Sequence, residues 1–401
     1  MKEENRNIEK GLYFVHGFYL EYEENGEINY ENIVRNHILL YKCTLEDIYN
    51  LEEFEININD PRIQGNIEEG HYVFYDGETI QNADEHPTAR LYREINTLVL
   101  EQLRRTNADS LPEKGYDRIS DVISYHVNVG HANCSLIVFY SDNKCHVWMV
   151  DCAIRGCRGY CNYHNNLDSC LDEIKKNNRV NKIEKLLITH MHYDHINGVE
   201  YVIKNGWIDG NTEVWLNLNY QHYSPTSDNM LLHLNGLGVK IIDPVIKNST
   251  NNIEILYPEI SYDNKHNRPP KGNINNASVM YKINLGEESM LFPGDIETEG
   301  WDSITWCEKW MARPTYYCIS HHGSKTGHFR NGCANKRISK KVNNIADCID
   351  NITKKQILMG KDGTFAGIYD NDVLKDFSNI EKTEGYKYIK LIWGSGHIDR
   401  I

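Results

Sequence analysis

The apolar positions after residue 120 fall in short runs that are too brief for helices. Residues 122–129, 135–140 and 145–150 follow one another closely, and a polar helical stretch to residue 178 comes next. Strands that alternate with helices in this way are typical of a layered α/β domain, so we expect two sheets with helices outside. Further strands of this domain are expected at residues 185–189, 213–218, 278–284, 289–292, 315–319, 356–359 and 388–393.

The first part of the chain has a different pattern. Residues 11–22 and 71–75 are rich in Tyr, Phe, Ile and Val and predict strands. A helix is expected to begin at Thr88, because one face of it is apolar. That face carries Leu91, Ile95, Leu98, Val99 and Leu103.

The segment at residues 107–115 collects turn-forming residues and has no periodicity, so we expect a domain boundary there. Residues 1–110 would form an N-terminal α+β domain of unassigned role, available to a protein partner. Residues 121–401 would form the catalytic domain and fold without the first unit.

Composition and charge narrow the functional classes. The chain has 40% hydrophobic and 25% charged residues, which is ordinary for a globular protein. Its formal net charge of -14 argues against a sequence-independent DNA coat, but it permits a locally basic or metal-neutralised cleft. No run approaches the roughly eighteen apolar residues of a membrane helix. The start is polar, and the 11 cysteines suit free thiols, so we expect a cytoplasmic protein without membrane contact.

A dense group of metal-ligating residue types follows the apolar run at residues 185–188. His190, His192, Asp194 and His195 occupy the loop that leaves this predicted buried strand. Two histidines two residues apart, followed by an Asp-His pair, do not all reach one tetrahedral ion comfortably. We therefore expect two adjacent cations.

Two later segments supply further ligands at strand ends. Asp295 follows the strand at 289–292 through Gly294, which permits a tight turn, and Asp295 is the candidate for a bridging carboxylate. His321 and His322 follow the strand at 315–319 and either complete the second ion or donate to a substrate oxygen. Taken singly, Asp295 would suit a solvated turn and the histidine pair a structural role. Three such segments, each at a strand end, favour a metal centre.

The sequence also resembles a known family. Residues 189–198 are similar to the signature T-H-x-H-x-D-H-x-x-G of the metallo-β-lactamase superfamily. Blocks at 127–134, 149–152, 275–279, 291–295 and 321–324 resemble the ComEC-like subgroup, which includes a competence-type nuclease domain and choline-phosphate esterases. The resemblance covers residues 121–401 and implies an αββα sandwich, to which the N-terminal α+β domain is added.

This resemblance implies a role for each ligand candidate. His190 and His192 would bind one ion, with Asp194, His195 and His322 binding the other and Asp295 bridging. His321 would then face the substrate as a catalytic group together with Asp194. Zinc is the favoured metal, and manganese is the alternative. The substrate side would include Asn276, Ser278, Ser324 and Lys325.

One departure from the family concerns the first ion. Many members of the superfamily carry a further histidine before the bridging aspartate, where this chain has the block at 275–278. The first ion is therefore expected to have fewer ligands.

Phosphodiester hydrolysis is the reaction that the resemblance favours. A hydroxide bridging the two divalent cations would attack a nucleic acid or nucleotide in line, as in a phosphodiesterase or nuclease. The alternatives are hydrolysis of a small ester, lactone or thioester, and a binding or regulatory protein that has lost the chemistry. A rim of basic residues beside the cleft would support a nucleic-acid substrate, although such runs of charge usually face solvent. Its members would be Lys325, Arg330, Lys336, Arg337, Lys340 and Lys341.

Overall fold

The computed structural model describes most of the chain at the level of side chains. The residues described are 8–19, 37–43, 53–68, 70–106, 115–156, 163–218, 224–244, 250–258, 274–303, 314–328, 345, 353–362 and 368–401. Within these ranges the strands form three sheets. None of the helices in these ranges is long and apolar enough to cross a bilayer.

The largest sheet has the strand order β12-β11-β10-β9-β8-β7-β19-β20 in the described part of the chain. Strands β9 to β12 run parallel, and β7, β8, β19 and β20 add antiparallel neighbours. The strands are β7 Ile119–Val127, β8 Cys134–Ser141, β9 Lys144–Cys152, β10 Lys185–Leu187, β11 Glu213–Trp215, β12 Lys240–Ile242, β19 Tyr388–Ile392 and β20 His397–Arg400.

The second sheet has the order β13-β14-β15-β16-β17-β18 among the described residues. Strands β15 to β18 are parallel, so their carboxyl ends meet at one edge of the sheet. The strands are β13 Ile253–Tyr257, β14 Met280–Leu285, β15 Glu288–Phe292, β16 Tyr316–Cys318, β17 Lys355–Leu358 and β18 Ile380–Lys382.

Strand β9 shows how the two sheets and the helices share one core. Successive side chains of a strand point to opposite faces. Trp148 and Val150 therefore lie in the apolar cluster between the sheets, where they meet residues such as Tyr281. Val147 and Met149 face the other way, into the cluster beneath the outer helices. Because both faces are buried, such strands appear in the sequence as continuous apolar runs.

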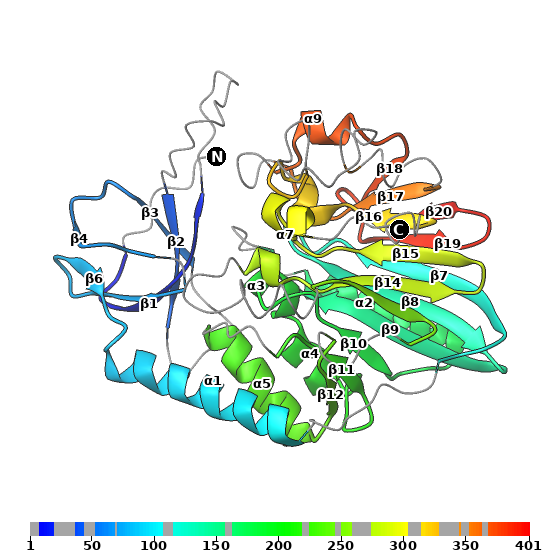
Figure 1. The fold of residues 1–401 in the computed structure, drawn as a ribbon, viewed down its shortest axis with the longest axis horizontal. Coiled ribbons are helices and arrows are strands. Elements are labelled where there is room, and N and C mark those ends of the chain that lie inside the picture. Colours follow the sequence, from blue (N-terminus) through cyan, green and yellow to red (C-terminus); the bar gives the residue numbers. More distant parts are fainter. Residues whose placement is uncertain are drawn as a thin grey trace.

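Helices cover the outer faces of both sheets, which gives four layers in the order αββα (Figure 1). The large sheet is covered by α2 His164–Asn178, α4 Val199–Lys204 and α5 Pro225–Leu237. The second sheet is covered by α7 Thr298–Ser303 and α9 Asn371–Leu374. Short turns at the strand ends are α3 Tyr193–Ile196, η2 Asn275–Ala277 and η4 Ser320–Gly323.

The N-terminal unit is a separate sheet with the order β3-β2-β1-β5-β6-β4, followed by one long helix. Its mainly antiparallel strands curl around the buried side chains of Tyr13, Val15, Leu40 and Val73. The elements are β1 Gly11–Tyr19, β2 His37–Lys42, β3 Glu53–Asn57, β4 Ile63–Gln64, β5 Tyr72–Tyr75, β6 Ile80–Asn82 and α1 Pro87–Thr106.

The predicted α/β sandwich with an added N-terminal α+β unit is confirmed, and the predicted strands agree with the observed ones to within a few residues. Helix α5 was not expected. Its buried side includes Ser227 and Asp228, and its exposed side carries Leu232 and Leu237, so it lacks the apolar stripe that marks a surface helix. Ser224 begins it with a capping box, and Gly238 ends it in the left-handed conformation.

Helix α1 belongs by its packing to the large sheet's helical layer. Val99, Leu100 and Leu103 are part of the same buried cluster as α2, α4 and α5. The loop expected to separate the domains, residues 107–114, lies outside the described residues. Independent folding of residues 121–401 stays a prediction, and such a fragment would expose the surface that α1 covers.

We predict that Leu100→Ala destabilises the catalytic unit, although Leu100 precedes the proposed boundary. The side chain is fully buried in the large cluster, so its truncation should lower the free energy of unfolding by about 2–5 kcal/mol. Leu98→Ala on the same helix is the matched control, since Leu98 is 66% exposed and should change little. Thermal melts of the full chain measure both. Equal melting temperatures for the two variants would contradict the shared core.

Candidate metal centre

The histidine-rich segment lies where β10 ends, at one end of the large sheet. The chain leaves Leu187 and passes through His190 and His192 before α3 begins at Tyr193. Asp194 and His195 therefore sit on the first turn of this helix, and the backbone amide of His195 donates to the carbonyl of His192 at 3.0 Å. Buried strands on both sides fix the start of this loop, so its ligands are held rigidly.

Asp295 comes from the second sheet and approaches α3 from the opposite side. It follows β15 after Gly294, whose φ of 62° favours glycine. A β-carbon at Gly294 would lie 2.8 Å from the Ser278 hydroxyl and 2.8 Å from the β-carbon of Thr189. The Asp295 amide donates to the same Ser278 hydroxyl at 3.1 Å. The predicted need for glycine is thus explained by the close approach of the two sheets.

The loop after β16 contributes His321 and His322 in an unusual backbone conformation. Their φ angles are 46° and 50°, in the left-handed region that non-glycine residues rarely adopt. Strain of this kind is concentrated at functional sites. His322 Nδ1 donates to the carbonyl of Met359 at 3.0 Å, which leaves Nε2 as the lone-pair nitrogen. His322 Nε2 lies 3.4 Å from Asp194 Oδ2 and 3.6 Å from Asp295 Oδ2.

Four of these residues form one compact group. Asp194, His195, Asp295 and His322 are all buried, and each has a ligand atom within 4.8 Å of those of the others. Asp295 Oδ1 and His322 Nε2 are buried without a hydrogen-bond partner. Buried polar atoms are normally satisfied, so this pair marks a place for a further bonded atom. Carboxylate oxygens and imidazole nitrogens at such spacing fit a first-row divalent cation.

The electrostatics of the group are dominated by opposite charges in a buried place. Burial favours the neutral form of each group, but the charged neighbours outweigh it. The pKa of Asp295 is held well below its ordinary range by His195, His322 and His321. The pKa of His195 is raised well above its ordinary range by Asp295, Asp151 and Asp194. The carboxylates are thus kept ionised, as metal ligands must be.

His190 and His192 adjoin the four-residue group. His190 Nε2 lies 3.1 Å from His192 Nδ1, and the ring centroids of His190 and His195 are 4.1 Å apart. Burial lowers the pKa of His190 well below its ordinary range, and the neighbouring His195 and His192 lower it further. A neutral imidazole with an available lone pair is the form that binds a cation. The six predicted ligands therefore come together at one end of the sandwich.

Asp151 is a residue of this centre that sequence reasoning did not assign. Its carboxylate accepts from the Thr189 amide at 2.7 Å and from the Thr189 hydroxyl at 2.8 Å. It also contacts His195 Nδ1 at 2.8 Å, which turns Nε2 of that ring toward Asp295 at 3.4 Å. The block at 149–152 was noted as a resemblance, but the spacing along the chain gave no sign of this partner.

His131 and Asn133, on the loop between β7 and β8, also reach the centre. The ring centroids of His131 and His322 are 4.0 Å apart, and burial lowers the pKa of His131 well below its ordinary range. The backbone amide of Asn133 donates to the backbone carbonyl of Asp194 at 3.0 Å. Both lie in the block at 127–134, so the resemblance located this loop without assigning a role to either side chain.

The four residues expected to bind substrate make hydrogen bonds or ion pairs within the protein. Ser278 holds Asp295, and the side-chain oxygen of Asn276 accepts from the amides of Glu297 and Gly300 at 2.9 and 3.2 Å. The Ser324 hydroxyl contacts that of Thr326 at 3.0 Å. Lys325 Nζ lies 3.4 Å from Asp370 Oδ2. These contacts brace the loops around the centre, and substrate binding by the four residues stays a prediction.

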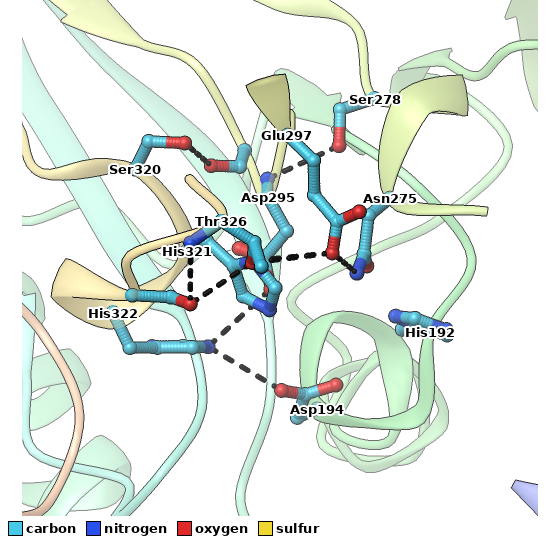
Figure 2. A network of polar contacts seen from close by, with 12 residues as sticks. His192, Asp194, Asn275, Ser278, Asp295, Glu297, Ser320, His321, His322 and Thr326 are labelled. Atoms are coloured by element: carbon cyan, nitrogen blue, oxygen red, sulfur yellow. Dashed lines mark hydrogen bonds and ion pairs between the residues drawn. The ribbon is translucent and has the colours of Figure 1, made fainter. Parts of the chain in front are cut away.

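His321 lies at the partly exposed side of the group. Its Nε2 is 3.8 Å from Asp295 Oδ2, and its side chain is 16% exposed, whereas that of His322 is 1% exposed. Figure 2 shows His321 beside Asp295, with His322 directed at Asp194 and Asp295. His322 is thus a buried ligand candidate, whereas solvent reaches its neighbour His321.

Comparisons with known proteins were made for the whole chain. No family model and no curated protein matches. Similar solved structures include the metallo-β-lactamase-fold protein YhfI from Bacillus subtilis, at 13% identity and a TM-score of 0.35, covering 70% of this chain and 100% of that one. A diphosphatase of the PhnP family has 10% identity, a TM-score of 0.35 and coverage of 71% and 100%. The diiron β-hydroxylase CmlA from Streptomyces venezuelae has 14% identity, a TM-score of 0.36 and coverage of 70% and 54%.

The chain's own architecture decides the fold. Two sheets face each other, helices cover both, and the ligand-bearing loops leave one end of both sheets. The chain has the metallo-β-lactamase fold. The candidate metal centre lies at one end of the sandwich, among the segments that follow β10, β15 and β16.

We predict that Asp151→Asn weakens metal binding by about 10- to 100-fold, because loss of a group that orients a ligand typically has this effect. Asp151 has a φ of 52°, and asparagine tolerates this conformation. Asp142→Asn is the matched control, since Asp142 has a φ of 49° and lies at an exposed turn. Titration against a metal chelator measures both affinities. An unchanged affinity for Asp151→Asn would remove Asp151 from the centre.

Proposed function

We propose that this chain is a hydrolase that depends on two divalent metal ions and cleaves phosphodiesters. The observation that carries the proposal is the buried group of Asp194, His195, Asp295 and His322, in which two polar atoms lack a hydrogen-bond partner. His190 and His192 adjoin the group and offer ligands for a second ion. Nitrogen and oxygen ligands of this kind suit zinc, with manganese as the alternative.

Each protein group has a distinct part in the proposed reaction. When bound, two divalent cations would supply an activated water and positive charge beside a phosphoryl group. Asp295 would hold the ions close together, and Asp194 would fix one of them. His321, on the partly exposed side, would carry a proton to the leaving oxygen. Asp151 and the Met359 carbonyl would keep the ligand imidazoles oriented.

The charge of the centre supports an anionic substrate. Asp151, Asp194 and Asp295 are the buried carboxylates in and beside the group. Two divalent cations would outweigh these three carboxylates by one positive charge before a hydroxide is bound, and the cations themselves would be the groups that meet an anion. The basic rim expected after the histidine pair adds little to this support. Arg330, Lys336, Arg337, Lys340 and Lys341 lie outside the described residues, and Lys325 is paired with Asp370.

The first prediction of the proposal is that the purified protein holds close to two transition-metal ions per chain, because six ligands converge at one end of the sandwich. Elemental analysis after exhaustive dialysis gives the ratio. A chain that retains no metal, after growth with zinc and with manganese, would contradict the proposal.

The second prediction concerns the bridging carboxylate. Asp295→Asn keeps the shape of the side chain but removes the charge that holds two cations together, so turnover should fall by roughly a thousandfold or more. The melting temperature should change far less. Hydrolysis of bis-p-nitrophenyl phosphate measures turnover.

Asp142→Asn controls for the loss of a carboxylate elsewhere and should leave turnover unchanged. A panel that includes p-nitrophenyl acetate separates the phosphodiester proposal from an ester hydrolase of the same centre. An Asp295→Asn protein that binds two metals and hydrolyses the phosphodiester at the parental rate would refute the site. A larger rate enhancement over the uncatalysed reaction for the carboxylic ester than for the phosphodiester would refute the substrate class alone.

A further inference from the structure

His321 stands between the metal centre and a polar pair that sequence reasoning did not single out. Its Nε2 faces Asp295, while its Nδ1 lies 3.2 Å from the hydroxyl of Thr326 and 3.6 Å from Glu297 Oε1. The Thr326 hydroxyl is in turn 3.4 Å from the same Glu297 oxygen. Figure 2 shows Glu297 and Thr326 together on the side of His321 that points away from Asp194.

The positions of the hydrogens on Thr326 and His321 follow from the Glu297 carboxylate, which can only accept a hydrogen bond. An ionised carboxylate only accepts, so the Thr326 hydroxyl donates its single hydrogen to Glu297. The hydroxyl oxygen is then an acceptor toward His321, and Nδ1 must carry the hydrogen of that contact. Ser324, 3.0 Å from the same hydroxyl, satisfies this arrangement as a second donor. Nε2 of a neutral His321 is therefore the lone-pair nitrogen, and it is directed at the metal centre.

Glu297 and Thr326 are both held by hydrogen bonds to neighbouring loops. Glu297 accepts from the side-chain amide of Asn275 at 3.0 Å, and its own amide donates to Asn276. The carbonyl of Thr326 accepts from the amide of Thr298 at 2.8 Å and from its hydroxyl at 3.0 Å. The loops after β15 and β16 are thus joined, and they close around Nδ1 of His321.

We propose that Thr326 and Glu297 are positioning residues that keep the hydrogen of His321 on Nδ1, so that Nε2 faces the reacting atoms. This inference rests on the proposed phosphodiester hydrolysis. Nε2 first takes a proton from the attacking water, so that His321 carries a hydrogen on both ring nitrogens. As the resulting hydroxide oxygen bonds to phosphorus and the bond from phosphorus to the leaving oxygen breaks, Nε2 gives this proton to the leaving oxygen. The proton that leaves the water ends on the leaving oxygen, so the reaction needs no other reactant.

The substrate's leaving group gives the sharpest kinetic test. A phenolate leaves poorly without a proton, whereas p-nitrophenolate leaves readily. Thr326→Val and Glu297→Gln should therefore lower kcat on diphenyl phosphate by about 10- to 100-fold and affect bis-p-nitrophenyl phosphate much less. Thr326→Ser, which restores a hydroxyl, should recover most of the loss. Thr79→Val is the matched control, because the Thr79 hydroxyl also contacts a carboxylate, that of Asp76 at 3.2 Å, but at an exposed position in the N-terminal unit.

Elemental analysis separates this role from direct metal binding. The metal content of Thr326→Val and Glu297→Gln should equal that of the parent protein. Loss of a metal ion from either variant would overturn the proposal in favour of a ligand role for His321. An equal loss of turnover on both phosphodiesters would overturn it as well, because such a loss is not tied to the leaving group.

The tautomer of His321 gives a readout that is independent of the substrate. Nitrogen NMR of the imidazoles, with His321 assigned by comparison with His321→Gln, should show the hydrogen on Nδ1 in the parent protein. In Thr326→Val the hydrogen should shift toward Nε2. An unchanged tautomer would overturn the proposal even if both phosphodiesters are cleaved. If neither ester is cleaved by the parent protein, the proposed function fails, and the tautomer shift still decides the positioning role.

Discussion

The structure depends on keeping ionised carboxylates buried where the two sheets end. Removing a charged group from water costs several kcal/mol unless partners compensate for the lost hydration. Asp194 and Asp295 are each at most 5% exposed, and the histidines between them are equally enclosed. The imidazoles balance the charge only while they are held in place. The contacts of Asp151 and of the Met359 carbonyl therefore hold these rings in their orientation.

Holding four chain segments at one point also constrains the backbone. Parallel strands deliver their carboxyl ends to one edge of a sheet, which brings β10, β15 and β16 to the centre. The segments that follow these strands also need unusual backbone dihedral angles to bring their side chains together. Asp151, His321 and His322 all have positive φ, and Gly294 has no room for a side chain. A non-glycine residue in this conformation costs about 1–3 kcal/mol, so the packing of both sheets must outweigh it.

Sequence patterns predicted the parts of this site that are local. Strands buried on both faces appear as apolar runs, and the ligands follow directly after them, so His190 to His195, Asp295 and the histidine pair could be placed at strand ends. The supporting groups are different. Glu297 and Thr326 meet across 29 residues of sequence, and Asp151 meets His195 across 44. Each pair joins segments at the ends of neighbouring parallel strands of one sheet, β15 and β16 for the first pair and β9 and β10 for the second, and no periodicity encodes that order of strands. Helix α5 was missed because buried Ser227 and Asp228, together with exposed Leu232 and Leu237, weaken its amphipathic pattern.

The N-terminal unit contacts the candidate metal centre through an apolar cluster that includes Tyr193. Tyr193, which lies in sequence between His192 and Asp194, is buried against β2, and its ring centroid is 5.0 Å from that of Tyr41. Leu12, Phe14 and Tyr72 complete the same cluster from the N-terminal sheet. The face of α3 opposite its ligands is therefore covered by residues from another sheet. Because the ligands occupy one side of a single helical turn, any change that loosens the N-terminal sheet acts on the orientation of Asp194 and His195. The candidate metal centre is thus supported from two sides, by the sandwich that carries its predicted ligands and by the N-terminal sheet.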